Sequence, residues 1–333
     1  MRKLDYQLLS TDKSGQQTDL TGLAQHLSWT GDGKTAARRL TMSAAQTARD
    51  THQPQPVVAL GDAAELLIGG DSVYVGTWLD SYEDTDGTTY ERVAYDRGFQ
   101  FKQNSDYISV SNQTPEEIAA MLADRCGCEL GRVASTGVRL SRNFLPGDYY
   151  SVLRTLYAMA SEQTGVRYRI RFDGGALQVV ELSLTAETLL LRPGSNLLRC
   201  AKTESAHDLV NRVRIYDDAD NLTETLDNTE SQTLYGVFQA AIKQSGHKDA
   251  AAAARQTLKD KDMTSTLTCD CLGSRRLVTG NTVVIHEPRM DLYGLCHIQS
   301  DVHTIERGIW RTRVQVSLED LISADDAALA AKE

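Results

Sequence analysis

The chain has 333 residues, of which 41% are hydrophobic and 24% are charged, an ordinary composition for a globular protein. Its 35 Lys and Arg against 45 Asp and Glu give a net charge of −10, which argues against a surface that grips nucleic acid through its phosphates. The length predicts two or three domains, because single hydrophobic cores stop growing well below it.

No segment predicts a membrane span or an export signal. The basic start at residues 1–3 has no apolar stretch behind it, and no run approaches the roughly 18 consecutive apolar residues of a membrane helix. The six cysteines are too sparse for a disulfide framework, so we expect reduced thiols in a protein made in a cytosol. They are Cys126, Cys128, Cys200, Cys269, Cys271 and Cys296.

Residues 1–110 predict an all-β block. Leu40, Met42 and Ala44 alternate with polar residues after a turn predicted at Trp29–Gly33. This alternation is typical of a strand with one buried face.

Two hairpins are predicted in the same block. The first joins Glu65–Ile68 to Ser72–Val75 through Gly69–Asp71, whose glycines tolerate positive φ. The second is longer, runs from Tyr74 to Tyr95 and has Asp86–Gly87 at its tip. Short strands divided by Gly and Asp turns predict a small barrel or sandwich.

The pattern then changes to helical spacing. Thr114–Glu117 combines a capping residue, a proline at the first helical position and a capping box, so a helix is expected to begin here and to end before Gly127. A second helix is predicted from Asp148 to Gln163, with Gly165 as its stop.

A hairpin follows the second helix. It is predicted to join Val166–Phe172 to Ala176–Leu182 through the turn Asp173–Gly175. Two helices and a hairpin predict a small α+β domain at residues 111–195.

A second β block is predicted at residues 196–320. Leu209–Tyr216 is expected to be a strand, and Asp217–Asn221 is expected to be its turn. Asp249–Lys261 is rich in alanine and predicts a helix. We interpret the region of about 235–262 as a helical insertion between barrel strands.

The segment 277–320 predicts an antiparallel sheet that must close on strands from earlier in the chain. The run 282–286 is rich in β-branched residues, and 306–308 predicts a hairpin turn before a strand that begins at Ile309. That strand alternates strictly, which predicts one buried and one wet face. Its expected buried face is Thr312, Val314, Val316 and Leu318, and its wet face is Arg311, Arg313, Gln315, Ser317 and Glu319. The acidic tail at 321–333 is expected to be a short exposed helix or a frayed end.

Two glycine-containing motifs resemble ligand-binding loops but lack residues that those loops require. Gly31–Thr35 resembles the end of a phosphate-binding loop, but the required earlier glycine is Ser28, so a β-turn is expected. Asp84–Gly87 resembles part of a calcium loop, but its first and twelfth ligand positions would be Tyr82 and Val93. A hairpin tip is expected there instead.

The cysteines and histidines do not predict a site either. Cys126–Cys128 and Cys269–Cys271 have one spacer residue, whereas zinc knuckles have two or more, so small buried thiols are favoured. His286, His297 and His303 lack the helical spacing of a metalloprotease. Because His297 and His303 share one strand parity, we expect both on a solvated or interface face. No catalytic, cofactor-binding or metal-binding residue is predicted, and no enzyme activity.

Several short segments form an ordered series along the chain. They are Trp29–Asp32 followed by Ala36–Leu40, Tyr74–Gly76 with Ala94–Asp96, Glu204–Ser205 leading into Asn211–Val213, Tyr235–Gly236 ahead of the alanine-rich helix, and the block Gly280–His303. In this order they resemble the XkdQ/YqbQ-like hub proteins of contractile phage tails and phage-tail-like bacteriocins. One departure is Tyr74, where the resemblance leads us to expect phenylalanine.

The resemblance implies a homotrimer whose subunits each contribute two tube-like β-barrel domains to a pseudo-sixfold ring. The expected fold is therefore mainly β, with barrel domains at 1–110 and 196–320 and an α+β domain between them. Closed symmetry suits a ring with a wide bore, and barrels hide strand edges or lend them to neighbours.

The resemblance also implies partners and a location. The ring would join the tail tube protein to the central spike protein and would contact a baseplate wedge or LysM-type baseplate protein. No membrane, no cofactor and no specific nucleic-acid binding are expected, although in a phage DNA would pass through the bore. The chain would be made in the bacterial cytoplasm and assembled into a virion or tailocin baseplate.

Two other functions stay open. A tail-associated cell-wall hydrolase should show an acid pair, a Cys–His pair or a zinc signature. A hub or spike base of a related contractile injection or secretion system shares the hub architecture, so the sequence scarcely separates it from a phage or a bacteriocin.

Overall fold

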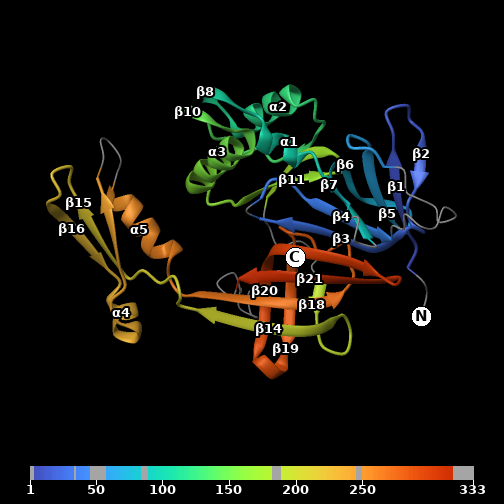
Figure 1. The fold of residues 1–333 in the computed structure, drawn as a ribbon. Helices are drawn as coiled ribbons and strands as arrows, with labels where there is room; N and C mark the ends of the chain where they lie inside the picture. The colour runs from blue at the N-terminus through green and yellow to red at the C-terminus, as the bar shows by residue number, and fades with distance from the viewer. Residues whose placement is uncertain are drawn as a thin grey trace. The chain divides into compact units, whose positions relative to one another are not determined.

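The protein is mainly β, as expected, and consists of two compact units (Figure 1). Unit 1 contains residues 1–200 and 269–333, and unit 2 contains residues 201–268. The computed structural model describes residues 4–33, 35–45, 58–83, 89–181, 189–244 and 250–317. None of the helices in these ranges is long and apolar enough to span a bilayer.

The N-terminal block of unit 1 is built from seven strands. They are β1 (Tyr6–Thr11), β2 (Gln17–Asp19), β3 (Ala24–Asp32), β4 (Arg39–Ala45), β5 (Ala63–Ile68), β6 (Asp71–Glu83) and β7 (Thr89–Tyr95). Both predicted hairpins are confirmed, β5–β6 and β6–β7. Gly69 and Gly70, with φ of 62° and 85°, allow the first turn, while the predicted tip at 86–87 lies outside the described residues. The turn predicted at 29–33 is wrong over most of its length, because Trp29 to Asp32 belong to β3.

The C-terminal strands complete the sheet of unit 1. They are β13 (Leu189–Leu191), β14 (Leu197–Ser205), β18 (Thr264–Leu272), β19 (Thr282–Glu287), β20 (Leu292–Glu306) and β21 (Ile309–Ser317), with the short helix η1 (Pro288–Met290) between β19 and β20. The hairpin predicted between β20 and β21 is confirmed, and its turn has positive φ at Arg307 and Gly308. In β21, Thr312, Val314 and Val316 are buried as predicted, and Leu318 and Glu319 lie outside the described residues.

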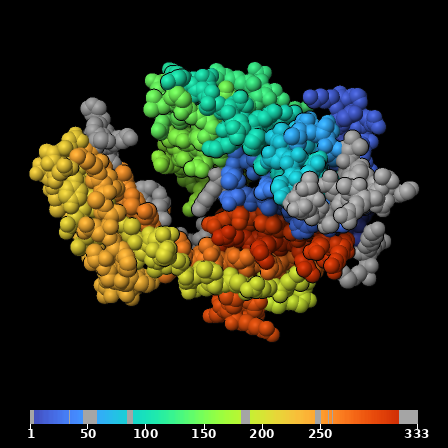
Figure 2. Space-filling model, in the orientation of Figure 1, coloured from blue at the N-terminus to red at the C-terminus, as the bar shows by residue number. Residues whose placement is uncertain are grey.

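Strands from the two ends of the chain share one sheet. β20 pairs antiparallel with β3, with Asp301 opposite Gly31 and His303 opposite Trp29. The pairing order is β14-β18-β21-β20-β3-β4-β7-β6-β5-β1-β2, and β19 extends it by pairing with β13 and β20. The C-terminal strands therefore lie directly against the N-terminal ones (Figures 1 and 2). This confirms that the C-terminal segment pairs with earlier strands.

A module of helices and short sheets follows β7 in unit 1. Its elements are α1 (Gly98–Gln103), β8 (Ser105–Gln113), α2 (Pro115–Arg125), β9 (Leu130–Val133), β10 (Leu140–Asp148), α3 (Tyr149–Thr164), β11 (Tyr168–Asp173) and β12 (Ala176–Glu181). Both predicted helices are confirmed, since Thr114 and Glu117 form the capping box and Gly165 ends α3 with φ 74°. The hairpin β11–β12 is also confirmed. The two helices pack on these strands through Leu122, Leu153 and other core residues.

Unit 2 has its own small sheet and core. Its elements are β15 (Arg212–Tyr216), β16 (Leu222–Asp227), α4 (Thr229–Tyr235), β17 (Gln239–Lys243) and α5 (Ala250–Asp260). The alanine-rich helix is confirmed as α5, which packs through Ala250 and Ala254 on Val213 and Ile215. The strand expected from residue 209 begins at residue 212. The preceding residue, Asn211, is buried, and its side chain forms hydrogen bonds with the backbone of residues 236 and 238.

The side chain of Asn211 holds the start of β15 to the start of β17. Its Nδ2 donates to the carbonyl of Gly236 at 2.7 Å, and its Oδ1 accepts from the backbone N–H of Phe238 at 2.8 Å. Both the Nδ2 and the Oδ1 of this buried side chain have hydrogen-bond partners. A shift of either strand would leave one of these buried polar atoms unpaired, so the side chain fixes the position of β15 against β17. Two segments of the ordered sequence series, at 211–213 and 235–236, therefore meet at this residue.

Candidate functional site

A cluster of buried polar side chains in unit 1 lies where β3 pairs with β20. Arg38, just before β4, donates from Nη1 and Nη2 to Oδ1 and Oδ2 of Asp301 at 3.1 and 2.5 Å. Asp301 is fully buried and lies 263 positions away in the sequence. A two-pronged guanidinium–carboxylate contact fixes both orientation and distance. It therefore ties the N-terminal block to β20.

Thr279, in the loop between β18 and β19, completes the contacts of this carboxylate. Its backbone N–H donates to Oδ1 of Asp301 at 2.7 Å, and its hydroxyl lies 2.5 Å from the same oxygen. Burial alone would raise the pKa of Asp301, but Arg38 and the His303 hydrogen bond outweigh it and hold that pKa well below its usual range. Asp301 is therefore an anion in the folded protein.

His303 lies beside Asp301 and is held on every side. Its ring stacks on Trp29, with ring centroids 4.6 Å apart and planes 3° apart. Nδ1 accepts from Nε1 of Trp310 at 3.2 Å and lies 2.9 Å from the Thr312 hydroxyl, while Nε2 lies 3.2 Å from Oδ2 of Asp301. With donors on Nδ1, the proton of the neutral ring belongs on Nε2, facing Asp301. Burial lowers the pKa of His303, in spite of the hydrogen bond to Asp301.

The expectation that His297 and His303 share a solvated face is wrong for His303, which is 1% exposed. The reason is a shift in the pairing of β20 with β21 between Ile298 and Ser300. An extra residue in one strand reverses which alternate side chains point inward. Ile298 is buried before the shift, and Asp301 and His303 are buried after it. Even-numbered residues therefore point inward before the shift and odd-numbered residues after it, so the same parity does not place His297 and His303 on the same face.

Glycines in the ordered sequence series make room for this cluster. A Cβ on Gly31 would lie 2.3 Å from Nη1 of Arg38 and 2.9 Å from Oδ1 of Asp301. A Cβ on Gly76 would lie 2.6 Å from the hydroxyl of Tyr74, whose Oη reaches the Arg38 carbonyl at 3.4 Å. The segments 29–32, 36–40 and 74–76 of the ordered series, each a weak motif by itself, are therefore in contact in the structure.

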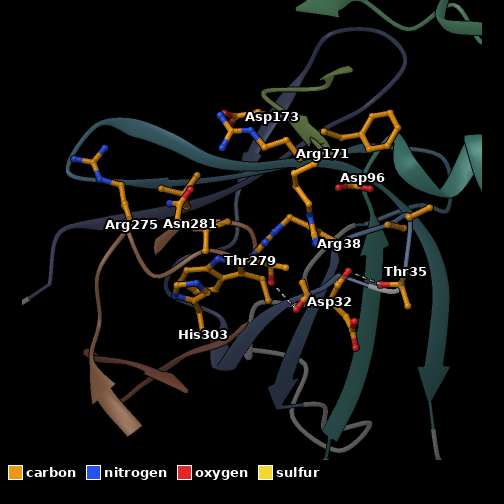
Figure 3. Close-up of a pocket in the computed structure, with 18 of the residues that line it drawn as sticks. Asp32, Thr35, Arg38, Asp96, Arg171, Asp173, Arg275, Thr279, Asn281 and His303 are labelled. Atoms are coloured by element: carbon orange, nitrogen blue, oxygen red, sulfur yellow. Dashed lines mark hydrogen bonds and ion pairs between the residues drawn. The ribbon is translucent and has the colours of Figure 1, made fainter. Parts of the chain in front are cut away.

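A cavity of about 210 Å³ adjoins the cluster (Figure 3). Figure 3 shows Arg38, Asp96, Thr279 and His303 among the side chains around it, from segments far apart in the sequence. Arg169, from β11, also lines this cavity, and its side chain lies close to the backbone of Gly280. Burial lowers the pKa of Arg169. The α+β module thus joins the two β blocks at the same place.

Asp96 is a second buried carboxylate at this cavity. Its Oδ1 accepts from the N–H of Gly98 at 2.9 Å, and its own N–H donates to the carbonyl of Arg38 at 3.1 Å, but Oδ2 has no partner among the described protein groups. Burial raises the pKa of Asp96 to about 7, although hydrogen bonds from the backbone of Arg38 and Gly98 and the Arg38 charge act to lower it. Asp96 is therefore expected to titrate near neutral pH.

This titration predicts a pH-dependent stability. The folded protein binds the Asp96 proton more tightly than the unfolded chain, so its contribution is complete below about pH 4 and is lost as the pH rises through about 7. Asp96→Asn cannot lose a proton. The difference in free energy of unfolding between Asp96→Asn and the natural protein should therefore shift by about 2–3 kcal/mol in favour of the variant when the pH is raised from 5 to 8. Urea unfolding at both pH values measures this, and an equal difference between the proteins at pH 5 and pH 8 would contradict it.

Thr312, His303 and Asp301 have the order of a hydrolytic triad, but their setting does not suit one. All three are at most 1% exposed, so a substrate cannot reach the Thr312 hydroxyl. The Asp301 carboxylate is already neutralised by Arg38, and Trp310 shares Nδ1 of His303 with Thr312. A nucleophile must reach its substrate and be relieved of its proton by a free base. The cluster instead holds strands together.

The two closely spaced cysteine pairs belong to different segments of unit 1. Cys126–Cys128 follow α2, and Cys269–Cys271 belong to β18. Cys128, Cys269 and Cys271 are buried as expected, while Cys126 is half-buried. Within the described ranges, no group of three or more His, Cys, Asp or Glu side chains could hold a metal ion. His286 is exposed and packs edge-on against Tyr293.

The residues of the cluster were not predicted as a site. Arg38 stands in the ordered series at 36–40, but nothing in the sequence pairs it with Asp301. The signal that could have found Asp301 is the pair Asp301 and His303, charged or polar at alternate positions of a strand whose neighbours are apolar. Counting alternation without the bulge places these side chains on the wrong face.

Comparisons with known proteins give a family, from a family model, and a fold, from solved structures. A family model described as YQBQ-like matches residues 27–317. The 43 kDa tail protein of prophage MuSo2 from Shewanella oneidensis is 16% identical, with a TM-score of 0.67 over 95% of this chain and 99% of that one. A tail protein from Neisseria meningitidis MC58 is 14% identical, with a TM-score of 0.64 over 95% and 97%.

A solved component of a secretion machine shares the fold as well. The c3393 protein of E. coli, described as a component of the type VI secretion system with structural similarity to T4 bacteriophage tail proteins gp27 and gp5, is 10% identical. Its TM-score is 0.51 over 90% of this chain and 74% of that one. No curated protein matches the sequence.

Proposed function

The chain belongs to the YQBQ-like family, and from this premise we propose that it is a structural hub subunit in the baseplate of a contractile tail. In this role three copies form a pseudo-sixfold ring that joins the tail tube to the central spike. The observation that carries the proposal is the match in fold to two prophage tail proteins over nearly the full length of both chains. The role is mechanical, without catalysis or cofactor.

The domain arrangement of the proposal follows the two β blocks. Residues 1–110 and 196–320 supply the tube-like domains, with unit 2 (201–268) as an insertion in the sequence of the second, and residues 111–195 supply the α+β domain between them. Three subunits can form a pseudo-sixfold ring only when the two tube-like domains of each subunit keep a fixed position relative to each other. The β3–β20 pairing and the buried contact of Arg38 with Asp301 support this requirement, because each joins the first block to the last strands.

Open strand edges support assembly with further copies. β14 stands at one end of the described pairing order and β2 at the other. An unpaired edge presents free backbone N–H and C=O groups to another strand, and a ring of subunits can satisfy them. The proposed partners are therefore two further copies, with the tube protein, the spike protein and a wedge or LysM-type baseplate protein at the ring's rims.

Size-exclusion chromatography with light scattering tests the oligomer. We expect a species with three times the 36.7 kDa mass of the chain, alone or after addition of the spike protein from the same particle. Concentration-dependent dissociation should give mostly single chains rather than dimers, because loss of one subunit from a closed threefold ring breaks two of its three contacts. A stable monomer that ignores the spike protein would contradict the hub proposal.

The likeness to the E. coli protein favours a second candidate, the spike base of a secretion machine. Electron microscopy of particles released from cells that produce the chain, with a label on the chain, separates the two. Label at the end of a contractile tail supports the hub of a phage or tailocin. Label on cell-bound structures without free tails supports the secretion machine. A zymogram on cell walls tests for hydrolase activity. A cleared band would favour the cell-wall hydrolase over the hub.

A further inference from the structure

Two thiols of unit 1 face each other across neighbouring strands. Cys200 on β14 and Cys269 on β18 have their Sγ atoms 3.3 Å apart, although they are 69 positions apart in the sequence. A disulfide has its sulfurs about 2.05 Å apart, so the two atoms need to approach by only about 1 Å. The sequence did not suggest this pair, since its cysteine motifs are 126–128 and 269–271.

The position of the pair in the chain gives it a consequence. The chain leaves unit 1 after Cys200 and returns to it at Cys269, so these residues stand at the two ends of unit 2. Unit 2 has a separate sheet and a separate core and is attached through β14 and β18. A bond between the cysteines would close this attachment covalently.

We propose that Cys200 and Cys269 form a reversible disulfide that ties the two ends of unit 2 together when the protein meets oxidising surroundings. The site is a modification site, and its reagent is a low-molecular-weight disulfide such as oxidised glutathione. Under reducing conditions the two cysteines remain thiols, and β14 and β18 are paired by hydrogen bonds without a covalent link. The bond adds a constraint on the unfolded chain, which grows with the length of the closed loop.

The chemistry balances as two exchange steps. Cys200, which is half-buried, loses its proton and attacks one sulfur of the small disulfide, forming a mixed disulfide and releasing one small thiolate. Cys269 then gives up its proton and attacks Sγ of Cys200, which releases the second small thiol. The two protein thiols are oxidised by two electrons in total, and the reagent is reduced to two thiols.

The environments of the thiols set this order. Cys269 is fully buried, and its contact with Cys200, together with burial, raises its pKa well above the usual range. Burial likewise raises the pKa of Cys271 to about 12. Since the thiolate is the attacking species, these two cysteines react slowly with a reagent in solution. Cys269 reacts only with a sulfur that is already beside it, namely that of Cys200.

The proposed function suggests when the bond forms, and only this point rests on it. A baseplate subunit is made in the reducing cytoplasm and is carried outside the cell in the finished particle. Assembly would then occur with both cysteines reduced, and the disulfide would form after release of the particle. Formation of the bond in the purified chain does not depend on that role.

Mass spectrometry of the full chain tests the bond. After removal of reductant and incubation with oxidised glutathione, we expect the intact mass to fall by about 2 Da, reversed by dithiothreitol, with peptides containing Cys200 and Cys269 linked. Cys200→Ser and Cys269→Ala should each abolish the linked peptide, and Cys126→Ala should retain it. No loss of mass, or a link at another pair of cysteines, would overturn the proposal.

Hydrogen exchange tests the tie itself. In the oxidised chain, amides of β14 and β18 next to the bond should exchange at least about tenfold more slowly than in the reduced chain. Cys200→Ser should show no such change with oxidant. Equal exchange rates in a chain whose bond is proven by mass would overturn the proposed tie. A monomeric protein that forms the bond would leave this inference intact while contradicting the hub.

Discussion

Asp301→Asn is expected to lower the free energy of unfolding of unit 1 by about 3–5 kcal/mol. The substitution keeps the shape of the side chain and removes its charge, which leaves the largely buried Arg38 guanidinium without its ion-pair partner. It also weakens the acceptor for the Thr279 N–H. Urea unfolding followed by tryptophan fluorescence measures the change, because Trp29 lies in the same cluster.

A neighbouring ion pair provides a matched control. Arg39, the next residue in the chain, pairs with Glu91 at 3.5 Å, and both side chains are largely exposed. Glu91→Gln makes the same acid-to-amide change and should cost less than about 1 kcal/mol. The double variant Arg38→Met with Asp301→Asn should regain much of the loss, since no unpaired charge remains and the amide oxygen can still accept from the Thr279 N–H. Similar costs for Asp301→Asn and Glu91→Gln would show that the buried pair is not a tie between the blocks.

The same variant carries a prediction on acid stability. The pKa of Asp301 is lower in the folded protein than in the unfolded chain, so its stabilisation is complete above the unfolded value and disappears as the pH falls. Asp301→Asn should therefore lose less stability than the natural protein between pH 6 and pH 3. This sign is opposite to that of Asp96, whose contribution is lost as the pH rises.

Trp29→Ala is expected to cost a further large amount, about 3–5 kcal/mol, because it opens a cavity in the core of the N-terminal block. Trp29 is 2% exposed and belongs to the cluster of buried residues around Leu27 and Leu40. Its removal also takes away the ring on which His303 stacks. Chemical denaturation gives the cost, and NMR titration of the imidazole gives the effect on His303.

The two readouts should move together. With the indole gone, water can reach His303, and its pKa should rise toward the ordinary value from which burial lowers it. Trp29→Phe keeps an aromatic ring and should recover more than half of the lost stability and leave the His303 pKa low. A His303 pKa that is unchanged in Trp29→Ala would show that the stack does not shield the imidazole.

Local elements of this fold could be predicted because their causes are local. The capping box at 114–117, the left-handed Gly165 and the glycine turn at 69–70 each depend on residues within one turn of the chain. The alternation in β21 likewise reports its buried face directly. Where a strand contains a bulge, as β20 does, the same reasoning failed, since one extra residue reverses the faces beyond it.

The sequence by itself determined the mainly β class, helices α2, α3 and α5, the hairpins β5–β6, β6–β7, β11–β12 and β20–β21 and, through an ordered series of short segments, the family. Only the tertiary structure decided that Trp29, Arg38, Asp96, Asp301 and His303 form one cluster, and that Cys200 faces Cys269. The physical reason is that backbone geometry and side-chain periodicity act over a few residues, whereas these contacts arise from pairing between distant strands. Which distant strand becomes a neighbour depends on how all the elements pack, and short patterns do not encode it.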